Sequence, residues 1–332
     1  MSGTGRTTCV RDRRGEHLLT LAYALLLDQL LGEPPSTLHP VVRIGRLVTA
    51  MERGAPTASP TAQLAYGVAL VAVVVGLASG TAALADAILQ RLPLGPRILL
   101  RAVLLKPTFA AKELLAAAER VHAPLEARDL GSARVALRSL VSRDPSNLDV
   151  PLIAAAAVES LAENTSDSIV APWLAFLAGG LPGAYAYRAA NTLDATVGYH
   201  GRYEYLGKPA ARCDDLLNVV PARLTAALIV AAAVPHGWAQ SALTVALRDH
   251  AVTSSPNAGW PMSAMAGALG VRLEKVGHYV LGRELRPPDA EDVAAASRLV
   301  TRLVAVTGFG LGVAGLARTL STRRGEAAWP FP

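Results

Sequence analysis

A long apolar run without charge constrains this chain more than any other feature of its sequence. No acidic or basic residue occurs from Leu64 to Ala85, and Asp86 is the first to follow. A helix needs about 20 mainly apolar residues to cross a bilayer. We therefore predict that this run forms a membrane-spanning helix.

Four further apolar runs are less uniform: Leu18 to Leu31, Ser168 to Tyr187, Leu224 to Leu247 and Leu303 to Ala317. The first contains Asp28, and no A-x-A site follows it, so we interpret it as a retained segment instead of a cleaved signal peptide. Glycines and a proline predict a break or a re-entrant turn in the second run. Pro235 interrupts the third, and the fourth is short enough to span only if its flanking arginines snorkel.

The composition favours helices over strands. Of the 332 residues, 52% are apolar, 17% are charged and only 5% are aromatic. Small aliphatic residues suit closely packed membrane helices, and the polar stretch Asp86 to Asp167 has the pattern of amphipathic helices, such as Lys112 to Arg128. We predict an all-α, multi-pass integral membrane protein with polar active-site loops. Its single domain is expected at residues 18–320, between tails at 1–17 and 321–332.

Charge and cysteine usage exclude two classes of partner. The net charge is +6, but Lys and Arg are scattered among acids and form no stripe, so no nucleic-acid partner is expected. Positive loops beside apolar spans account for the excess. Cys9 and Cys213 lie far apart and form no CxxC pair, so no zinc site is expected.

The densest acidic segment runs from Arg143 to Asp167. Glu159, Glu163 and Asp167 are four residues apart, which stacks three carboxylates on one helix face. No Lys or Arg lies between Arg143 and Arg188 to relieve their repulsion, so we expect a bound cation or a distant basic loop. Oxygen ligands of this kind suit Mg²⁺ carried by nucleotide phosphates. A solvated acidic face is an equally good interpretation of the spacing alone.

A second polar stretch follows, from Tyr187 to Arg223. Such density of charge and amide beside a membrane span is costly unless it lines a polar cavity, although an ordinary hydrophilic loop is the alternative. Its carboxylates can add metal contacts and its basic residues can grip phosphate. The candidates are Asn191, Asp194, Arg202, Lys208, Arg212, Asp214, Asp215 and Asn218.

Two shorter motifs and one false match complete the pattern. His39 lies in a Pro-rich N-terminal motif, and Asn257 lies in a loop rich in Pro and Gly. A lone histidine is more often structural than catalytic. Gly310, Gly312 and Gly315 fit GxGxxG inside an apolar run with no preceding strand, which indicates close helix packing. No GxxxxGK[ST] sequence occurs, which excludes the usual P-loop.

Taken in order, these blocks resemble the CobD/CbiB family, also called adenosylcobinamide-phosphate synthases. The matching segments are LDQLLGEPPSTLHPV, RDPSNLD, VESLAENTSDSIVAPW, YRAANTLDATVGYHGRYEYLGKPAARCDDLLNVVPARL and SPNAGWPMSAMAGALGVRLEK. They cover most of the chain from Leu27 to Lys275, and the third and fourth are long and chemically unusual. Glu33 and Pro145 depart from the family's frequent Asp and Thr.

The resemblance implies ATP-dependent amide formation between adenosylcobyric acid and aminopropanol or its O-phosphate. In that interpretation Mg-ATP is held by Glu159, Glu163 and Asp167, with Asp214 and Asp215 as further metal contacts. Phosphate is oriented by Arg202, Lys208 and Arg212. His39, Asp194 and Asp144 are the candidate catalytic residues, the first two as general base, and the amide-rimmed corrin is expected to meet Asn191, Asn218 and Asn257.

The expected setting is the bacterial inner membrane, with the site facing the cytoplasm and other cobalamin-pathway enzymes as possible partners. Because the motifs must meet at one site, at least one apolar run is expected not to cross. Two rival functions are open. An AmpE-like membrane sensor without ligase activity would not need both the acidic stack and the Asn-Thr-Leu-Asp block. A transporter would place charges centrally in its spans, and only Asp28 is placed so.

Overall fold

The structure is a computed structural model that describes residues 13–37, 39–57, 59–198 and 203–327, with side chains to residue 321. Helices dominate it, which confirms the all-α, multi-pass membrane prediction. The strands described are two short ones, β1 (Leu273–Lys275) and β2 (Tyr279–Leu281), which pair antiparallel as a hairpin.

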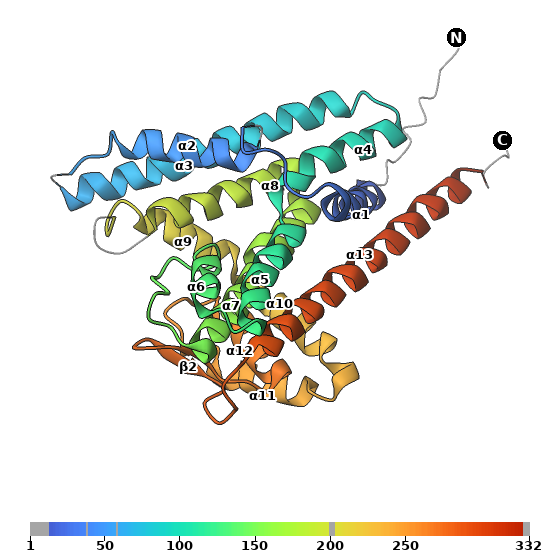
Figure 1. The fold of residues 1–332 in the computed structure, drawn as a ribbon. Helices are drawn as coiled ribbons and strands as arrows, with labels where there is room; N and C mark the ends of the chain where they lie inside the picture. The colour runs from blue at the N-terminus through green and yellow to red at the C-terminus, as the bar shows by residue number, and fades with distance from the viewer. Residues whose placement is uncertain (1–12, 38, 58, 199–202, 328–332) are drawn as a thin grey trace, which may run out of the picture.

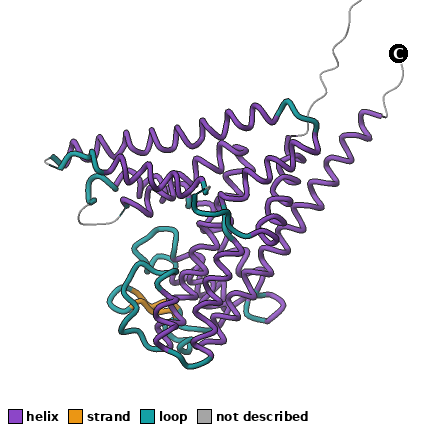
Figure 2. Tube along the Cα trace, turned by 45° about the horizontal axis from the view of Figure 1, so that its top comes forward, coloured by secondary structure: helices purple, strands orange, loops and turns teal. Residues whose placement is uncertain are grey.

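The helices fall into groups along the chain, as Figure 1 shows. One side of the molecule carries α2 (Pro40–Glu52), α3 (Pro60–Leu89) and α4 (Leu94–Leu105). The other gathers α5 (Ala111–Glu126), α6 (Leu130–Leu137), α7 (Val150–Thr165), α10 (Val219–Ala232), α11 (Ala239–Asp249) and α12 (Gly259–Leu269). Between them lie α1 (Arg13–Leu31), α8 (Ala171–Val197) and α9 (Lys208–Leu217), and α13 (Ala290–Ala327) runs from the second group past α1. Figure 2 shows the long loops and the hairpin at the end opposite α3.

Four segments of the described chain are long and apolar enough to cross a membrane: Pro60–Leu89, Val150–Val197, Val219–His236 and Ala290–Ser321. The run from Leu64 to Ala85 lies inside the first, as predicted. Only 17% of its most apolar window is buried, and Leu84 is 65% exposed. Large apolar side chains that point away from the protein are expected where lipid replaces water.

The structure corrects the bounds of two predicted spans. The run Leu224 to Leu247 is not one helix, because the apolar segment ends at His236 and α11 begins at Ala239. Pro235 offers no backbone donor, and Gly237 reverses the chain with φ 76°. The run Leu303 to Ala317 is part of a much longer helix, so it needs no snorkelling flanks to reach across a bilayer.

The break predicted between Ser168 and Tyr187 is confirmed. A 48-residue helical segment, Val150–Val197, changes direction at Gly180, whose φ of 64° and ψ of −155° are open to glycine alone. Pro182 follows two residues later, in the first turn of the C-terminal part of α8. A proline is tolerated there because the backbone N–H groups of a first helical turn have no partner within the helix. The bend separates the N-terminal part of α8 from the C-terminal part, which carries Tyr187 and Asp194.

A buried ion network fixes the N-terminal helix to the α3–α4 pair. Arg97 Nη2 and Arg101 Nη1 donate to the two oxygens of Glu16 at 2.6 and 3.0 Å. Arg101 also donates two hydrogen bonds to Asp86. These two acidic and two basic side chains neutralise one another in the protein interior, where burying any one of them unpaired would cost free energy. Helix α1 begins at Arg13 and helix α13 ends at Ala327 in the described part of the chain.

Close packing of α13 on α1 explains the glycines of the GxGxxG match. A Cβ added to Gly315 would lie 2.9 Å from the Leu18 Cβ and 3.0 Å from the Leu19 backbone nitrogen, and one on Gly312 would lie 3.6 Å from the Ala22 Cβ. Around Gly310 there is nothing within 4 Å. Two of the three glycines thus serve helix contact, as the sequence indicated.

Gly315→Ala is expected to destabilise the protein, because neither a Cβ atom nor a backbone nitrogen can move aside easily. Overpacking of this kind costs about 1–3 kcal/mol. Gly310→Ala is the matched control, and it should be neutral or stabilising by roughly 0.5–1 kcal/mol through helix propensity. Thermal unfolding in detergent measures both, and equal melting temperatures for the two variants would contradict the packing account.

Candidate active site

A small acidic cavity of about 200 Å³ lies where several parts of the chain meet. Residues from the end of α7, the following turn, α8, α9 and the loop before α12 line it. Its carboxylates are Glu163, Asp167, Asp194, Asp214 and Asp215, and its amides are Asn218 and Asn257. The structure thus brings together seven of the residues that the sequence singled out.

A π-helical turn presents Asp167 to this cavity. Residues Ser166–Val170 leave the α-helical repeat between α7 and α8, and single π turns inside α-helices are frequent at functional sites. Ser166 is 1% exposed, and its hydroxyl has no partner in the described structure. Glu163, at the end of α7, and Asp167, in the π turn, both line the cavity.

Glu159, the third member of the predicted stack, does not line the cavity. Its side chain is buried, and Oε2 lies 3.7 Å from Nη2 of Arg143. Lys275, on β1, interacts electrostatically with both Glu159 and Glu163. The distant basic residue that the sequence required is therefore present in the hairpin, and Arg143 is a local partner for Glu159 that the spacing argument had overlooked.

Two asparagines hold Asp214 in place. Asn191 Nδ2 donates to Oδ1 at 3.2 Å, and Asn218 Nδ2 donates to Oδ2 at 2.8 Å. Tyr187 in turn donates its hydroxyl to Oδ1 of Asn218 at 2.8 Å. Burial raises the pKa of Asp214, and the neighbouring Asp215 adds to this, while the two amide donors offset only part of it. Two of the three predicted corrin-binding asparagines, Asn191 and Asn218, are thus engaged with a carboxylate that lines the cavity.

Arg188 is a functional candidate that the sequence reasoning did not use. It lies toward the C-terminal end of the apolar helical segment Val150–Val197, its Nε is inaccessible and without a partner among the described residues, and Nη1 donates to Asn191 at 3.3 Å. Glu33, Asp167 and Asp214 interact with it electrostatically. A charge inside an apolar span marks function more often than structure, and this signal was present in the sequence.

Asn257 links the cavity to an aromatic support. Its Nδ2 donates to the Asp215 carbonyl at 2.7 Å, and its Oδ1 accepts from Arg223 at 3.1 Å. The Arg223 guanidinium lies 5.1 Å from the centre of the Trp260 ring. The His250 ring stacks on the same Trp260 ring, with 3.9 Å between the ring centres. The Pro- and Gly-rich loop before α12 is therefore anchored on both sides.

The remaining predicted residues lie outside the cavity lining. Arg212 is 76% exposed, with Nη1 at 3.8 Å from Asp215, so it lies beside the cavity rim. Lys208 is exposed at the start of α9, and Asp144 is 72% exposed in the loop before α7. Arg202 lies outside the described residues, as does Cys9.

His39 belongs to a separate charged cluster. Its Nε2 lies 2.6 Å from Glu33, and its Nδ1 accepts the Val41 N–H at the start of α2. Lys106 donates to Glu33 at 2.7 Å and lies 3.4 Å from the buried Asp28. Burial alone would raise the pKa of Glu33, but the hydrogen bonds from His39 and Lys106 outweigh it and the pKa is lowered. Both nitrogens of His39 are therefore occupied.

The donor set of the cavity fits Mg²⁺ as it binds with nucleotides. Among the described residues, no group of three carboxylate, histidine or cysteine side chains converges as a complete metal cage. Mg²⁺ does not require one, because it usually keeps several waters and takes one or two carboxylates together with substrate phosphates. Glu163, Asp167 and Asp214 offer oxygen ligands of the right kind.

Comparison with known protein families matches residues 21–302 to the family model of the CobD/CbiB protein. The chain belongs to the CobD/CbiB family. The cobalamin biosynthesis protein CobD of Dehalococcoides mccartyi is 44% identical over 273 residues, which is 82% of this chain and 89% of that protein. The probable cobalamin biosynthesis protein CobD of Pyrococcus furiosus is 39% identical over 85% of this chain and 93% of that protein. The cobalamin biosynthesis protein CobD of Rhodobacter capsulatus is 43% identical over 76% of this chain and 80% of that protein. No solved structure matches the chain.

The match covers every part of the CobD/CbiB chain that forms the cavity. Asp167 and Asp194 lie near its middle and Asn257 before its end. The hairpin with Lys275 is also included, whereas the outer end of α13 is not. The cavity is thus built from the part of the chain that defines the family.

Asp249 connects α11 to the hairpin and should be needed for stability at neutral pH. Its Oδ2 accepts the buried Gly282 N–H at 2.7 Å, and both oxygens accept from Arg248. These bonds lower the pKa of Asp249, Arg248 foremost. Asp249→Asn should therefore lose about 1.5–3 kcal/mol at pH 7.

The pH dependence of this loss has a defined sign. A lowered pKa contributes stability above the ordinary Asp value of about 3.9, and that stability is lost as the pH falls through the folded value. The gap in melting temperature between wild type and variant should shrink as the pH falls below about 4. Glu284→Gln removes an exposed partner of the same Arg248 and should change little. A gap that is constant with pH would contradict the ion-pair account.

Proposed function

We propose that this chain acts in cobalamin biosynthesis as a ligase that joins adenosylcobyric acid to (R)-1-aminopropan-2-ol or its O-phosphate with ATP. The observation that carries the proposal is the cavity in which five carboxylates from separate family motifs meet. The names of the relatives support the pathway, and the chemistry of the cavity supports the reaction class. The proposed setting is the bacterial inner membrane, with the cavity open to the cytoplasm, where ATP is found.

The reaction needs activation of a carboxylate. Its oxygen is a poor leaving group, so the substrate carboxylate attacks the γ-phosphorus of ATP, giving an acyl phosphate and ADP. The neutral amine then attacks the acyl carbon, the C–N bond forms, and phosphate leaves. One proton must be removed from the substrate ammonium in the process. The acidic cavity supplies metal ligands for the first step and a base for the last.

Mg²⁺, when bound, would neutralise the phosphate oxygens and polarise the transferred phosphoryl group. Glu163 and Asp167 are the proposed ligands, with Asp214 held by its two asparagines as a third. Arg188 interacts electrostatically with Asp167 and Asp214, where it would limit their mutual repulsion, and its hydrogen bond keeps Asn191 oriented. Glu159 is proposed to act through Lys275, which it shares with Glu163.

Asp194 is the proposed general base. It lines the cavity, and no hydrogen bond to its carboxylate from a described residue is recorded, whereas His39 uses both ring nitrogens elsewhere. A cavity of about 200 Å³ is smaller than a typical site for a cofactor-sized ligand, roughly 300–1,000 Å³. The corrin and the adenosine must therefore lie largely outside it, with only the reacting groups inside.

Glu163→Gln is expected to abolish product formation while the protein remains folded. The change keeps the size of the side chain and removes the negative charge that a metal ligand needs. Product formation from adenosylcobyric acid, aminopropanol and Mg-ATP is measured on purified protein in detergent, with a Mg²⁺ titration. Glu119→Gln, on an exposed face of α5, is the control and should retain full activity. Normal turnover of Glu163→Gln at limiting Mg²⁺ would contradict the metal role.

Arg212 is expected to select the phosphorylated amine, because it lies beside the rim of the cavity. Removing a charge-assisted contact to phosphate costs about 1.5–3 kcal/mol. In Arg212→Ala, kcat/KM should fall for aminopropanol O-phosphate and much less for free aminopropanol. Lys208→Ala tests the other exposed basic candidate of the same helix in the same way, and free aminopropanol is the internal control for both variants. An equal loss for both amines would assign Arg212 to ATP.

A further inference from the structure

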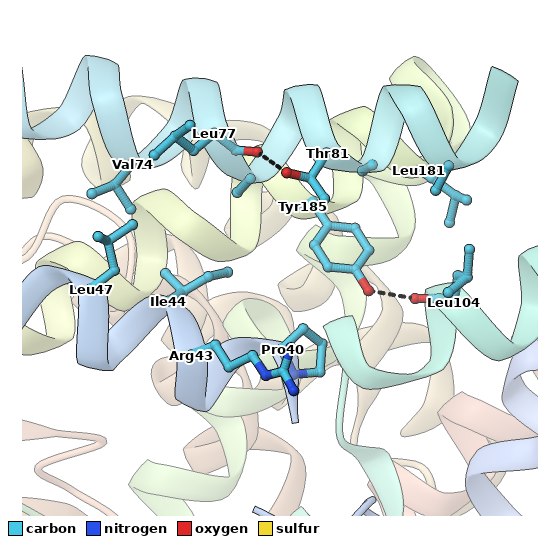
Figure 3. Close-up of a pocket in the computed structure, with 13 residues that line it drawn as sticks. Pro40, Arg43, Ile44, Leu47, Val74, Leu77, Thr81, Leu104, Leu181 and Tyr185 are labelled. Carbon is cyan, nitrogen blue, oxygen red and sulfur yellow. Dashed lines mark hydrogen bonds between the residues drawn. The ribbon is translucent and has the colours of Figure 1, made fainter. Parts of the chain in front are cut away.

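A second, apolar cavity lies between α2, α3, α4 and α8 and shares no residue with the acidic one (Figure 3). Its volume is about 360 Å³, within the usual range for ligand sites of roughly 300–1,000 Å³. Val74, Leu77 and Ala82 of α3 form one wall, and Leu104 and Leu181 close the far end. The proposed ligase chemistry gives this cavity no task.

The hydroxyl groups of Thr81 and Tyr185 in its wall are already satisfied by the protein. Thr81 donates its hydroxyl to the Leu77 carbonyl at 2.7 Å, and Tyr185 donates to the Leu104 carbonyl at 2.9 Å, as the dashed lines in Figure 3 show. Water needs two to four polar partners to occupy a cavity. The apolar walls therefore suit a hydrocarbon chain and do not suit a polar substrate.

The cavity lies against a helix that faces lipid. The α3 segment is the most apolar of the four candidate spans and the least buried. Leu77, which lines the cavity, is itself 54% exposed. An apolar hollow that opens at this depth of a membrane protein is accessible to the acyl chains around it.

A basic residue marks the rim of the cavity. Arg43, on α2, lines the cavity with its guanidinium beside Pro40 in Figure 3, and among the described residues no hydrogen bond or ion pair to it is recorded. The α2 segment also carries Arg46, with Glu52 as its one acidic residue. Arginines beside a membrane attract the phosphates of anionic lipids, worth about 1 kcal/mol each.

We propose that this cavity binds an anionic phospholipid, with one acyl chain between α3 and α8 and the phosphate on Arg43. The apolar walls determine the chain, and the unpaired guanidinium determines the charge of the head group. This inference is independent of the ligase proposal, because it rests on a different cavity and different residues.

The test uses the purified full chain in detergent, titrated with dioleoyl phosphatidylglycerol or dioleoyl phosphatidylcholine. Native mass spectrometry counts bound lipid, and the rise in melting temperature gives the apparent affinity. Wild type should bind phosphatidylglycerol more tightly than phosphatidylcholine. Arg43→Gln should weaken phosphatidylglycerol binding about five-fold and leave phosphatidylcholine binding unchanged.

Matched variants separate a built site from general attraction. Arg46→Gln removes the same charge from the same helix outside the lining and should have a much smaller effect. Ala78→Leu fills the cavity and should weaken both lipids, whereas Ala72→Leu, on an exposed face of α3, should not. These variants need no ligase activity for their interpretation.

Three results would overturn the proposal. Equal losses in Arg43→Gln and Arg46→Gln would indicate non-specific electrostatic attraction. Lipid binding that is unchanged in Ala78→Leu would show that the chain does not enter the cavity. Stabilisation by glycerol phosphate equal to that by phosphatidylglycerol would assign Arg43 to a soluble anion.

Discussion

Repulsion between carboxylates in a small cavity is the constraint on which the rest of this structure depends. One cavity of about 200 Å³ is lined by five of them: Glu163, Asp167, Asp194, Asp214 and Asp215. Like charges this close are tolerated only where donors and cations surround them. The protein supplies these from a distance: asparagines on Asp214, Arg188 behind the cavity and Lys275 from the hairpin. The negative charge that these groups leave uncompensated gives the cavity an affinity for a cation, which the proposed reaction uses.

The supports of the cavity come from elements that are themselves fixed by ion pairs. The hairpin with Lys275 is tied to α11 through Asp249, and α1 is tied to α3 and α4 through Glu16. These pairs lie at the ends of apolar helices, where a neutralised charge is cheaper than a free one. Different charged residues therefore serve stability and the cavity, so variants can test the two roles separately.

The sequence predicted the helical membrane fold because uninterrupted apolar runs such as Leu64 to Ala85 leave few alternatives. It also singled out most of the cavity lining, because acids and amides are conspicuous in an apolar chain. It could not show that Glu159 stays outside the cavity that Glu163 lines, since a regular four-residue spacing does not reveal the approach of Arg143 to Glu159. Nor could it show that Leu224 to Leu247 turns at Gly237, or that Lys275 returns to the acidic stack, because both depend on tertiary contacts.

The most direct measurement is the coupling of ATP consumption to amide formation by the purified protein in detergent. The account predicts that ADP appears only when adenosylcobyric acid and aminopropanol, or its O-phosphate, are both present, and that one ADP accompanies each amide formed. Amide formation without ATP, or ATP consumption independent of both substrates, would contradict the assignment of the acidic cavity to an ATP-dependent ligase.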